Sequence, residues 1–252
     1  MIRLSMLGAV DVRGPDDGQL RCLLAQPKQL ALLAYLAAAT PRAFHSRDTL
    51  LALLWPELDQ EHARAALRQA LYLLRKSLGD DVVATCGDGV IGLDHTRISC
   101  DVICFDQAIA SEHRAEAVML YGGELLTGFH VSGAPDFQRW LDGERTRLAE
   151  RATTAAWKLV DCEEEQGNLV GALEWARRSL TIVPDDERVL RRAVALLDRL
   201  GDRIGALRTY RTFADRIAAE YSMAPAPETE ALITTIRSSA ALPVRSVPSR
   251  IR

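Results

Sequence analysis

The fold of the second half of this chain is decided by a stretch that occurs twice, "GNLVGALEWARR" (residues 167–178) and "GDRIGALRTYRT" (residues 201–212). The two copies share an initial glycine and an internal Gly-Ala-Leu, at positions 34 residues apart. A period of 34 residues is typical of tetratricopeptide repeats, in which each unit is a hairpin of two helices. One such unit cannot bury its own apolar face, so we expect further helices to stack beside it.

The residues around this repeat predict helices only. Residues 135–166 are expected to form one long helix or two shorter ones, and we expect no strand after Phe105. Small residues at Gly171 and Ala172 are expected to let neighbouring helices approach closely, while larger ones such as Trp175 fill the next layer. From about Cys100 the chain is therefore predicted to be all-α.

The first hundred residues predict a different architecture that begins with a sheet. β-forming residues at 2–12 are followed by the turn "GPDDG" at 14–18, and residues 20–25 are expected to return along them as a strand. Pro27 then occupies a favoured first-turn position and predicts the start of a helix.

Two more helices and a hairpin are expected after this point. Ser46 is a suitable N-cap for a helix that runs to Trp55, and Arg64–Gly79 forms the next helix after a polar loop. Residues 82–93 predict two short strands around "GDG". The order predicts a winged helix-turn-helix with an N-terminal β-sheet. The whole chain is thus expected to be mainly α, with an α+β N-terminal part.

The predicted third helix, "RAALRQALYLLRKSLG", carries two stripes. Successive residues turn about 100° around a helix, so its leucines share one side for the core, and its arginines gather beside them. No acidic residue occurs between His62 and Gly79. The candidate DNA-contacting residues are Arg64, Arg68, Gln69, Tyr72, Arg75 and Lys76, with Arg47 at the start of the preceding helix.

These residue types suit a DNA groove. Arginine can fork onto guanine and glutamine can pair with adenine, while tyrosine and lysine can contact phosphates. Arg42 and Arg47 are candidates for contacts to the DNA backbone. The alternative is an ordinary solvated helix face, which charged stripes more often indicate. The position of the helix, third and directly before a wing, favours DNA binding.

Composition restricts the classes of protein to which this chain can belong. The chain has 252 residues, is 48% hydrophobic and 26% charged, and has a net charge of −3. Residues 1–100 hold 11 basic and 11 acidic residues, so any DNA site must come from local clustering. The longest apolar run, residues 30–39, is too short to span a bilayer, and the N-terminus makes a poor signal peptide. We therefore expect a cytoplasmic protein without membrane contact.

Catalytic and metal-binding motifs are not found. There is no phosphate-binding loop, nucleophile elbow or zinc-protease signature, so we expect neither an enzyme nor a cofactor. Cys100 and Cys104, with His95 nearby, lack the second ligand pair of a structural zinc site. We expect no metal, and buried reduced thiols instead. The acidic run at residues 163–165 fans out around a helix and is interpreted as a solvated face.

Two family resemblances follow from these motifs. Residues 1 to about 95 resemble the winged-helix output domain of bacterial response regulators, through "SRDTLLALLW", "LRQALYLLRKSLG" and "VVATCGDGVIGL". The segments "YGGELLTGFH" and "FQRWLDGERTRL", followed by the 34-residue repeats, resemble the bacterial transcriptional activator domain. This order is that of the SARP family of activators. The resemblance divides the chain into a winged helix (1–97), an activator domain (98–237) and a flexible tail or linker (238–252).

The resemblance implies an activator that binds repeated half-sites in double-stranded DNA and recruits RNA polymerase, with a homodimer on DNA among the possible arrangements. It also implies that the loop between the second and third helices lies near the polymerase. The acidic residues of this loop suit a basic polymerase surface, although a solvated acidic turn is an equal alternative. They are Glu57, Asp59 and Glu61.

The wing departs from the family pattern in three places. Cys86 stands where a basic residue is common, Val90 replaces an aromatic residue, and the acidic Asp88 occupies the tip. With the neutral charge of the first half, these departures leave an alternative function open. In this alternative, the protein is a tetratricopeptide-like interaction scaffold whose degenerate winged helix binds DNA weakly or not at all.

Overall fold

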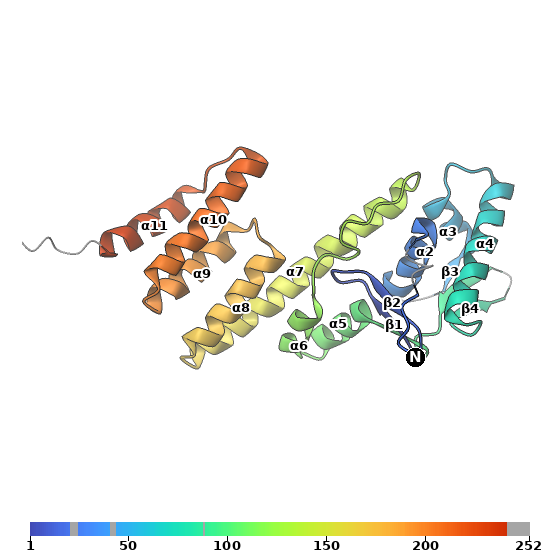
Figure 1. Ribbon diagram of the computed structural model, residues 1–252, viewed down its shortest axis with the longest axis horizontal. Helices are drawn as coiled ribbons and strands as arrows, with labels where there is room; N and C mark the ends of the chain where they lie inside the picture. The colour runs from blue at the N-terminus through green and yellow to red at the C-terminus, as the bar shows by residue number, and fades with distance from the viewer. Residues whose placement is uncertain (21–24, 41–43, 88, 241–252) are drawn as a thin grey trace, which may run out of the picture. The chain divides into compact units, whose positions relative to one another are not determined.

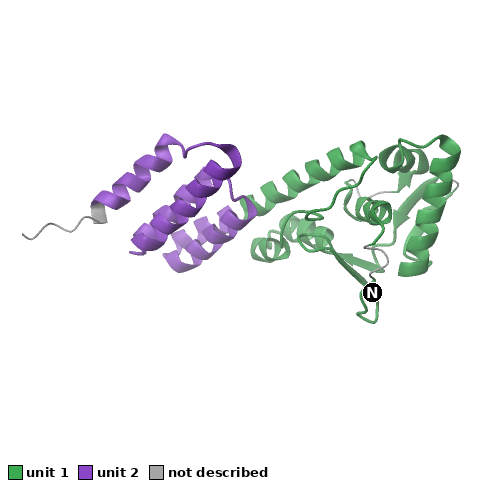
Figure 2. Ribbon diagram, turned by 45° about the horizontal axis from the view of Figure 1, so that its top comes forward, with its two compact units in different colours: residues 1–155 green, residues 156–252 purple. Residues whose placement is uncertain are grey.

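The computed structural model describes residues 1–240 apart from 21–24, 41–43 and 88. The chain divides into two compact units, residues 1–155 and 156–252 (Figure 2). All six named strands belong to the first unit, whereas the described part of the second is helical. Helix α7 (Pro135–Glu165) begins in the first unit and ends in the second. The division proposed from the sequence, at residue 98, stays a prediction.

The N-terminal sheet has three strands in the order β2-β1-β6. Strand β1 (Ile2–Ser5) lies beside β2 (Asp11–Arg13), with which it pairs antiparallel (Figure 1). Its other edge pairs parallel with β6 (Ile98–Cys100). The chain thus turns back inside the stretch 2–12, and the strand expected at 20–25 falls largely outside the described residues. Sequence reasoning missed β6, because a strand of three residues is too short to show an alternating pattern.

Three helices and a second sheet form the winged helix-turn-helix. The helices are α2 (Pro27–Ala38), α3 (Arg47–Leu54) and α4 (Gln60–Leu78). The second sheet has the order β3-β5-β4, from β3 (His45–Ser46), β5 (Val90–Leu93) and β4 (Val83–Cys86). The predicted capping of α3 is confirmed, since the Ser46 hydroxyl accepts a hydrogen bond from the Thr49 N–H at 3.0 Å. Gly79 ends α4 with a φ of 102°.

The start of α4 corrects the sequence prediction. The helix begins at Gln60, four residues before Arg64, and the loop before it is correspondingly shorter. The reason is a cap, because Asp59 accepts hydrogen bonds from the N–H groups of Glu61 and His62, both at 3.0 Å. Glu61 therefore lies in the first helical turn and not in the loop.

The leucine stripe of α4 packs as the helical period predicts. Leu67, Leu71, Leu74 and Leu78 are all buried, together with Leu50 and Leu54 of α3. Since one side of α4 is fixed in this core, the arginines beside the leucines have to face outward. The confirmed core thus sets the orientation of the basic stripe.

His45, just before α3, packs within a group of aromatic rings. Its ring centroid lies 4.8 Å from that of Tyr35 on α2, and Tyr35 lies 4.9 Å from Trp140 on α7. The buried Nε2 atom of His45 has no hydrogen-bond partner within the described part of the chain. Burial lowers the pKa of this imidazole, because the charged form would lose its hydration.

We expect this histidine to make the winged helix sensitive to acid. The unfolded chain binds its proton at about pH 6.5, while the folded chain resists protonation until the pH is lower. Stability is therefore complete above about pH 6.5 and falls as the pH drops toward the folded pKa. His45→Phe keeps a ring without a titratable group. Thermal unfolding at pH 7.5 and 5.5 should show a smaller loss for this variant than for the wild type, and equal losses would contradict the assignment.

Two short helices lead to an irregular segment that we call the strap, residues 121–134. They are α5 (Asp101–Ala110) and α6 (Arg114–Leu120). The strap is hydrogen-bonded to the residues that come directly after β1. There the Leu126 N–H donates to the Met6 carbonyl at 2.8 Å. Leu126 has a φ of 51°, a conformation rare for bulky residues that persists only where surrounding contacts hold it.

Arg145 on α7 holds the strap through three backbone carbonyls. Its guanidinium donates to Leu125 and Leu126 at 2.9 Å each and to Phe129 at 3.4 Å. These bonds bring a charged donor to carbonyls of the strap, one of which, that of Leu126, also accepts from the Phe129 N–H at 2.9 Å. A charged side chain of the activator region thus fixes a segment that packs on the N-terminal sheet.

The second unit consists of the end of α7 followed by α8 (Leu169–Ile182), α9 (Glu187–Arg199), α10 (Arg203–Tyr221) and α11 (Pro227–Ala240). Neighbouring helices share a core that includes Val160, Ala172, Leu197 and Phe213. The expected helix pairs are therefore confirmed, and both copies of the repeated stretch contribute a buried alanine, Ala172 and Ala206.

The repeated glycines have a role in helix capping besides the close helix approach expected at Gly171. Asn168 caps α8 by accepting from the Gly171 N–H at 3.1 Å, and Asp202 caps α10 by accepting from the Gly205 N–H at 2.8 Å. A Cβ at either glycine would overlap the capping side chain. The glycine therefore makes room for the cap of its own helix, and a Cβ at Gly171 would also lie 2.8 Å from the Glu163 carboxylate of the neighbouring helix α7.

Candidate nucleic-acid interface

The exposed stripe of α4 presents cations in successive turns. Arg64 and Arg68 are exposed, Arg75 is half-buried, and the Tyr72 side chain between them is 58% exposed. None of Arg47, Arg64 and Arg68 forms an ion pair within the described residues, so their charges are not neutralised there. An uncompensated cluster of this kind attracts a polyanion.

Two adjoining hollows connect this stripe to α3 and the wing. One, of about 370 Å³, extends toward the end of α4, and the other, of about 510 Å³, extends toward the wing. Arg47 and Arg68 line both, so together the hollows form one continuous basic groove. The basic groove is lined by Ser46, Arg47, Asp48, Leu51, Arg64, Leu67, Arg68, Leu71, Tyr72, Arg75, Lys76, Asp80, Gly89 and Val90.

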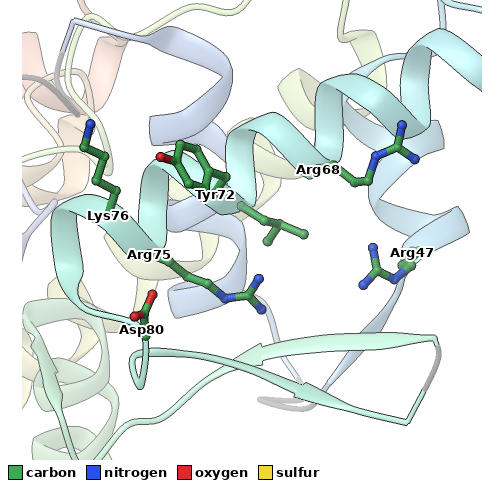
Figure 3. Close-up of a pocket in the computed structure, with 7 residues that line it drawn as sticks. Arg47, Arg68, Tyr72, Arg75, Lys76 and Asp80 are labelled. Carbon is green, nitrogen blue, oxygen red and sulfur yellow. The ribbon is translucent and has the colours of Figure 1, made fainter.

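The side chains differ in how they face the groove. Figure 3 shows Arg47 and Arg75 directed into the space between α4 and the hairpin, whereas Lys76 points away from the hairpin. A nitrogen of Arg75 donates to the Val83 carbonyl of β4 at 3.4 Å, which ties the helix to the wing. Asp80 lines the same end of the groove and opposes the positive charge there.

The turn end of the wing is fixed to α3. The Arg47 N–H donates to the Gly89 carbonyl at 2.9 Å, and β4 pairs with β5 from Val83 to Leu93. The hairpin predicted around "GDG" is thereby confirmed. Cys86 is exposed, while the predicted effect of Asp88 at the tip concerns a residue outside the described part of the chain, as does the candidate Arg42.

Gln69 lies in a different hollow from the arginines. We call this hollow, of about 490 Å³, the rear groove. It is formed by the start of α2, the end of α3, one side of α4 and three residues of the strap. Its lining residues are Gln26, Pro27, Lys28, Gln29, Trp55, Ala66, Gln69, Ala70, His130, Val131 and Ser132. No sequence signal pointed to it, because the strap residues are about sixty positions away from α4.

The three acidic residues of the polymerase-contact prediction differ in their surroundings. Glu57 pairs with Lys28, whose ammonium also lies 5.8 Å from the Trp55 ring centroid. Partial burial opposes ionisation of Glu57, but the hydrogen bond from Lys28, a backbone hydrogen bond and the charge of Lys28 together outweigh it, so the pKa is lowered. Hydrogen bonds from His62 lower the pKa of Asp59. Glu61 is exposed in the first turn of α4.

Cys100 and Cys104, the pair considered for a metal site, differ in burial. Cys100 is buried, and burial raises the pKa of its thiol to about 12, while Cys104 is half-buried. Within the described ranges, no cluster of three or more histidine, cysteine, aspartate or glutamate side chains is arranged to hold a metal ion. In the same ranges, no helix has both the length and the apolar character needed to cross a membrane.

A winged helix with a basic groove, joined to paired helices, defines the class of the protein as a helix-turn-helix transcription regulator. Residues 104–237 match the model of the bacterial transcriptional activator domain. This match covers more than half of the chain, so the protein belongs to that family, and its domain order is that of the SARP-type regulators.

A solved structure supports the fold along nearly the whole chain. Mycobacterium tuberculosis EmbR, solved in complex with a low-affinity phosphopeptide, is similar with a TM-score of 0.59 and 21% sequence identity. The similarity covers 96% of this chain and 66% of the EmbR chain. No curated protein sequence matches.

Proposed function

We propose that this protein is a sequence-specific DNA-binding transcriptional activator that acts in the cytoplasm. The observation that carries the proposal is the basic groove, where three arginines without ion pairs in the described structure face outward beside a wing. In the proposed complex α4 enters the major groove. The DNA-contacting residues are Arg64, Arg68, Tyr72, Arg75 and Lys76 of α4, with Arg47 on the backbone.

The family supports further steps of the proposal. The protein binds direct repeats of a half-site, with two copies side by side on DNA, and contacts RNA polymerase through Glu57, Asp59 and Glu61. The winged helix of residues 1–97 supplies the DNA contacts, and residues 98–237 supply protein contacts. Residues 238–252 are proposed to be a flexible tail or linker.

Selection of bound sequences from a random DNA pool tests the proposal. We expect a direct-repeat motif of regular spacing, bound with an affinity that falls steeply as salt rises. The logarithm of the binding constant should fall by about 0.9 per contacted phosphate for each tenfold increase in salt. If no sequence is enriched and no salt-dependent binding is detected, the scaffold alternative replaces the activator.

A further inference from the structure

The basic groove contains two carboxylates that the proposed DNA contacts do not use. Asp48 of α3 lines the hollow toward the wing together with Arg64, and Asp80, which follows α4, lines the other hollow together with Arg75 (Figure 3). Both aspartates are exposed, and neither forms an ion pair within the part of the chain that the structure describes. Each negative charge can therefore act on a phosphate that comes close to it.

The stability of the helices accounts for one of these charges at most. Asp48 lies in the first turn of α3, where a carboxylate stabilises a helix. Asp80 comes directly after Gly79, the residue that ends α4, and a carboxylate at that end of a helix is unfavourable. Aspartate is common in turns, but the uncharged asparagine suits a turn equally well. The local structure therefore does not explain the charge of Asp80.

Repulsion by these carboxylates acts differently on the two ways in which the groove can hold DNA. Non-specific binding consists almost entirely of cations that face phosphates, and its register changes as the protein moves along the duplex. Phosphates then pass close to both carboxylates. In a specific complex the base contacts fix the register, so that each phosphate keeps one place beside the arginines and away from the carboxylates. The two charges therefore weaken the non-specific complex more than the specific one.

We infer that Asp48 and Asp80 are specificity-determining residues, which raise the ratio of specific to non-specific DNA affinity by repelling phosphates from the basic groove. The inference rests on the proposed DNA binding and adds to it two residues that make no attractive contact. It also gives a function to the even balance of 11 basic and 11 acidic residues in the first hundred. With no excess of positive charge, the protein is held on DNA only where its few unpaired arginines find their bases.

Asp48→Asn and Asp80→Asn in the full chain test the inference, because each removes a charge and keeps the size of the side chain. Affinity is measured for two duplexes of equal length, one with the sequence obtained from the pool selection and one with the same bases in scrambled order. Each variant should bind the selected duplex about two- to fivefold more tightly and the scrambled duplex about tenfold more tightly. The ratio of the two affinities then falls about two- to fivefold. The salt slope for the scrambled duplex should steepen by about one.

Asp81→Asn is the charge-matched control. The Asp81 side chain is 73% exposed, lines neither hollow, and its partner Arg97 keeps an ion pair with Asp94. This variant should change both affinities by the same factor and leave their ratio at the wild-type value.

Two results overturn the inference. One is an equal gain for both duplexes in Asp48→Asn and Asp80→Asn, which would make the two charges part of the general field of the protein. The other is weaker binding of the selected duplex with a changed preference at one base pair, which would make the carboxylate a direct base contact. If the pool selection enriches no sequence for the wild type, the proposed DNA binding itself fails, so the two failures are distinguishable.

Discussion

Replacing Arg64 and Arg68 together with alanine should reduce DNA affinity about 100-fold at moderate salt. Each arginine is exposed, without an ion pair in the described structure, and placed on the outward stripe of α4. Loss of one base or phosphate contact costs roughly 1–3 kcal/mol, so two losses give about this factor. Titration of a labelled DNA fragment at several salt concentrations measures both the affinity and its salt slope.

The matched control changes charge in the opposite direction at the same groove. Asp80 lines the end near Arg75 and Lys76, so Asp80→Asn removes a repulsion and should strengthen binding about two- to fivefold. The double arginine variant should also lower the salt slope by about one to two. Wild-type affinity in the double variant would show that the basic groove does not hold DNA.

Replacing Arg145 with methionine should destabilise the first unit by about 2–4 kcal/mol. Methionine keeps much of the apolar stem but leaves the carbonyls of the strap without their charged donor. Leu126 would then lose one of the contacts that hold its left-handed backbone conformation. Urea unfolding followed by tryptophan fluorescence should show a lower midpoint with a similar slope.

Arg139→Met is the control for this prediction. Arg139 lies on the same helix, is 78% exposed and pairs only with the neighbouring Asp136 in the described structure, so its loss should cost less than about 0.5 kcal/mol. Arg145→Met is also expected to leave the DNA affinity of folded protein unchanged, because Arg145 does not line the basic groove. Equal stability of the two variants would contradict the role given to Arg145.

The helices of this protein could be predicted because their signals are local. The period of 3.6 residues placed the leucines of α4 inside, and the first-turn positions of Pro27 and Ser46 marked two helix starts. The four-residue error at α4 has the same local origin. Asp59 belongs to a polar stretch that is typical of a loop, but its carboxylate accepts hydrogen bonds from the first N–H groups of the helix.

The sequence by itself determined the repeated helix pairs, the winged helix and the stripe of arginines, since each depends on spacing within one element or on a fixed period. Tertiary structure decided which of those residues meet. The tertiary structure placed Arg47 and Arg68 along the same groove and Gln69 along another groove with Val131 of the strap. It also paired β1 with β6. These contacts link residues about twenty to a hundred positions apart, and no local pattern encodes the packing that brings them together.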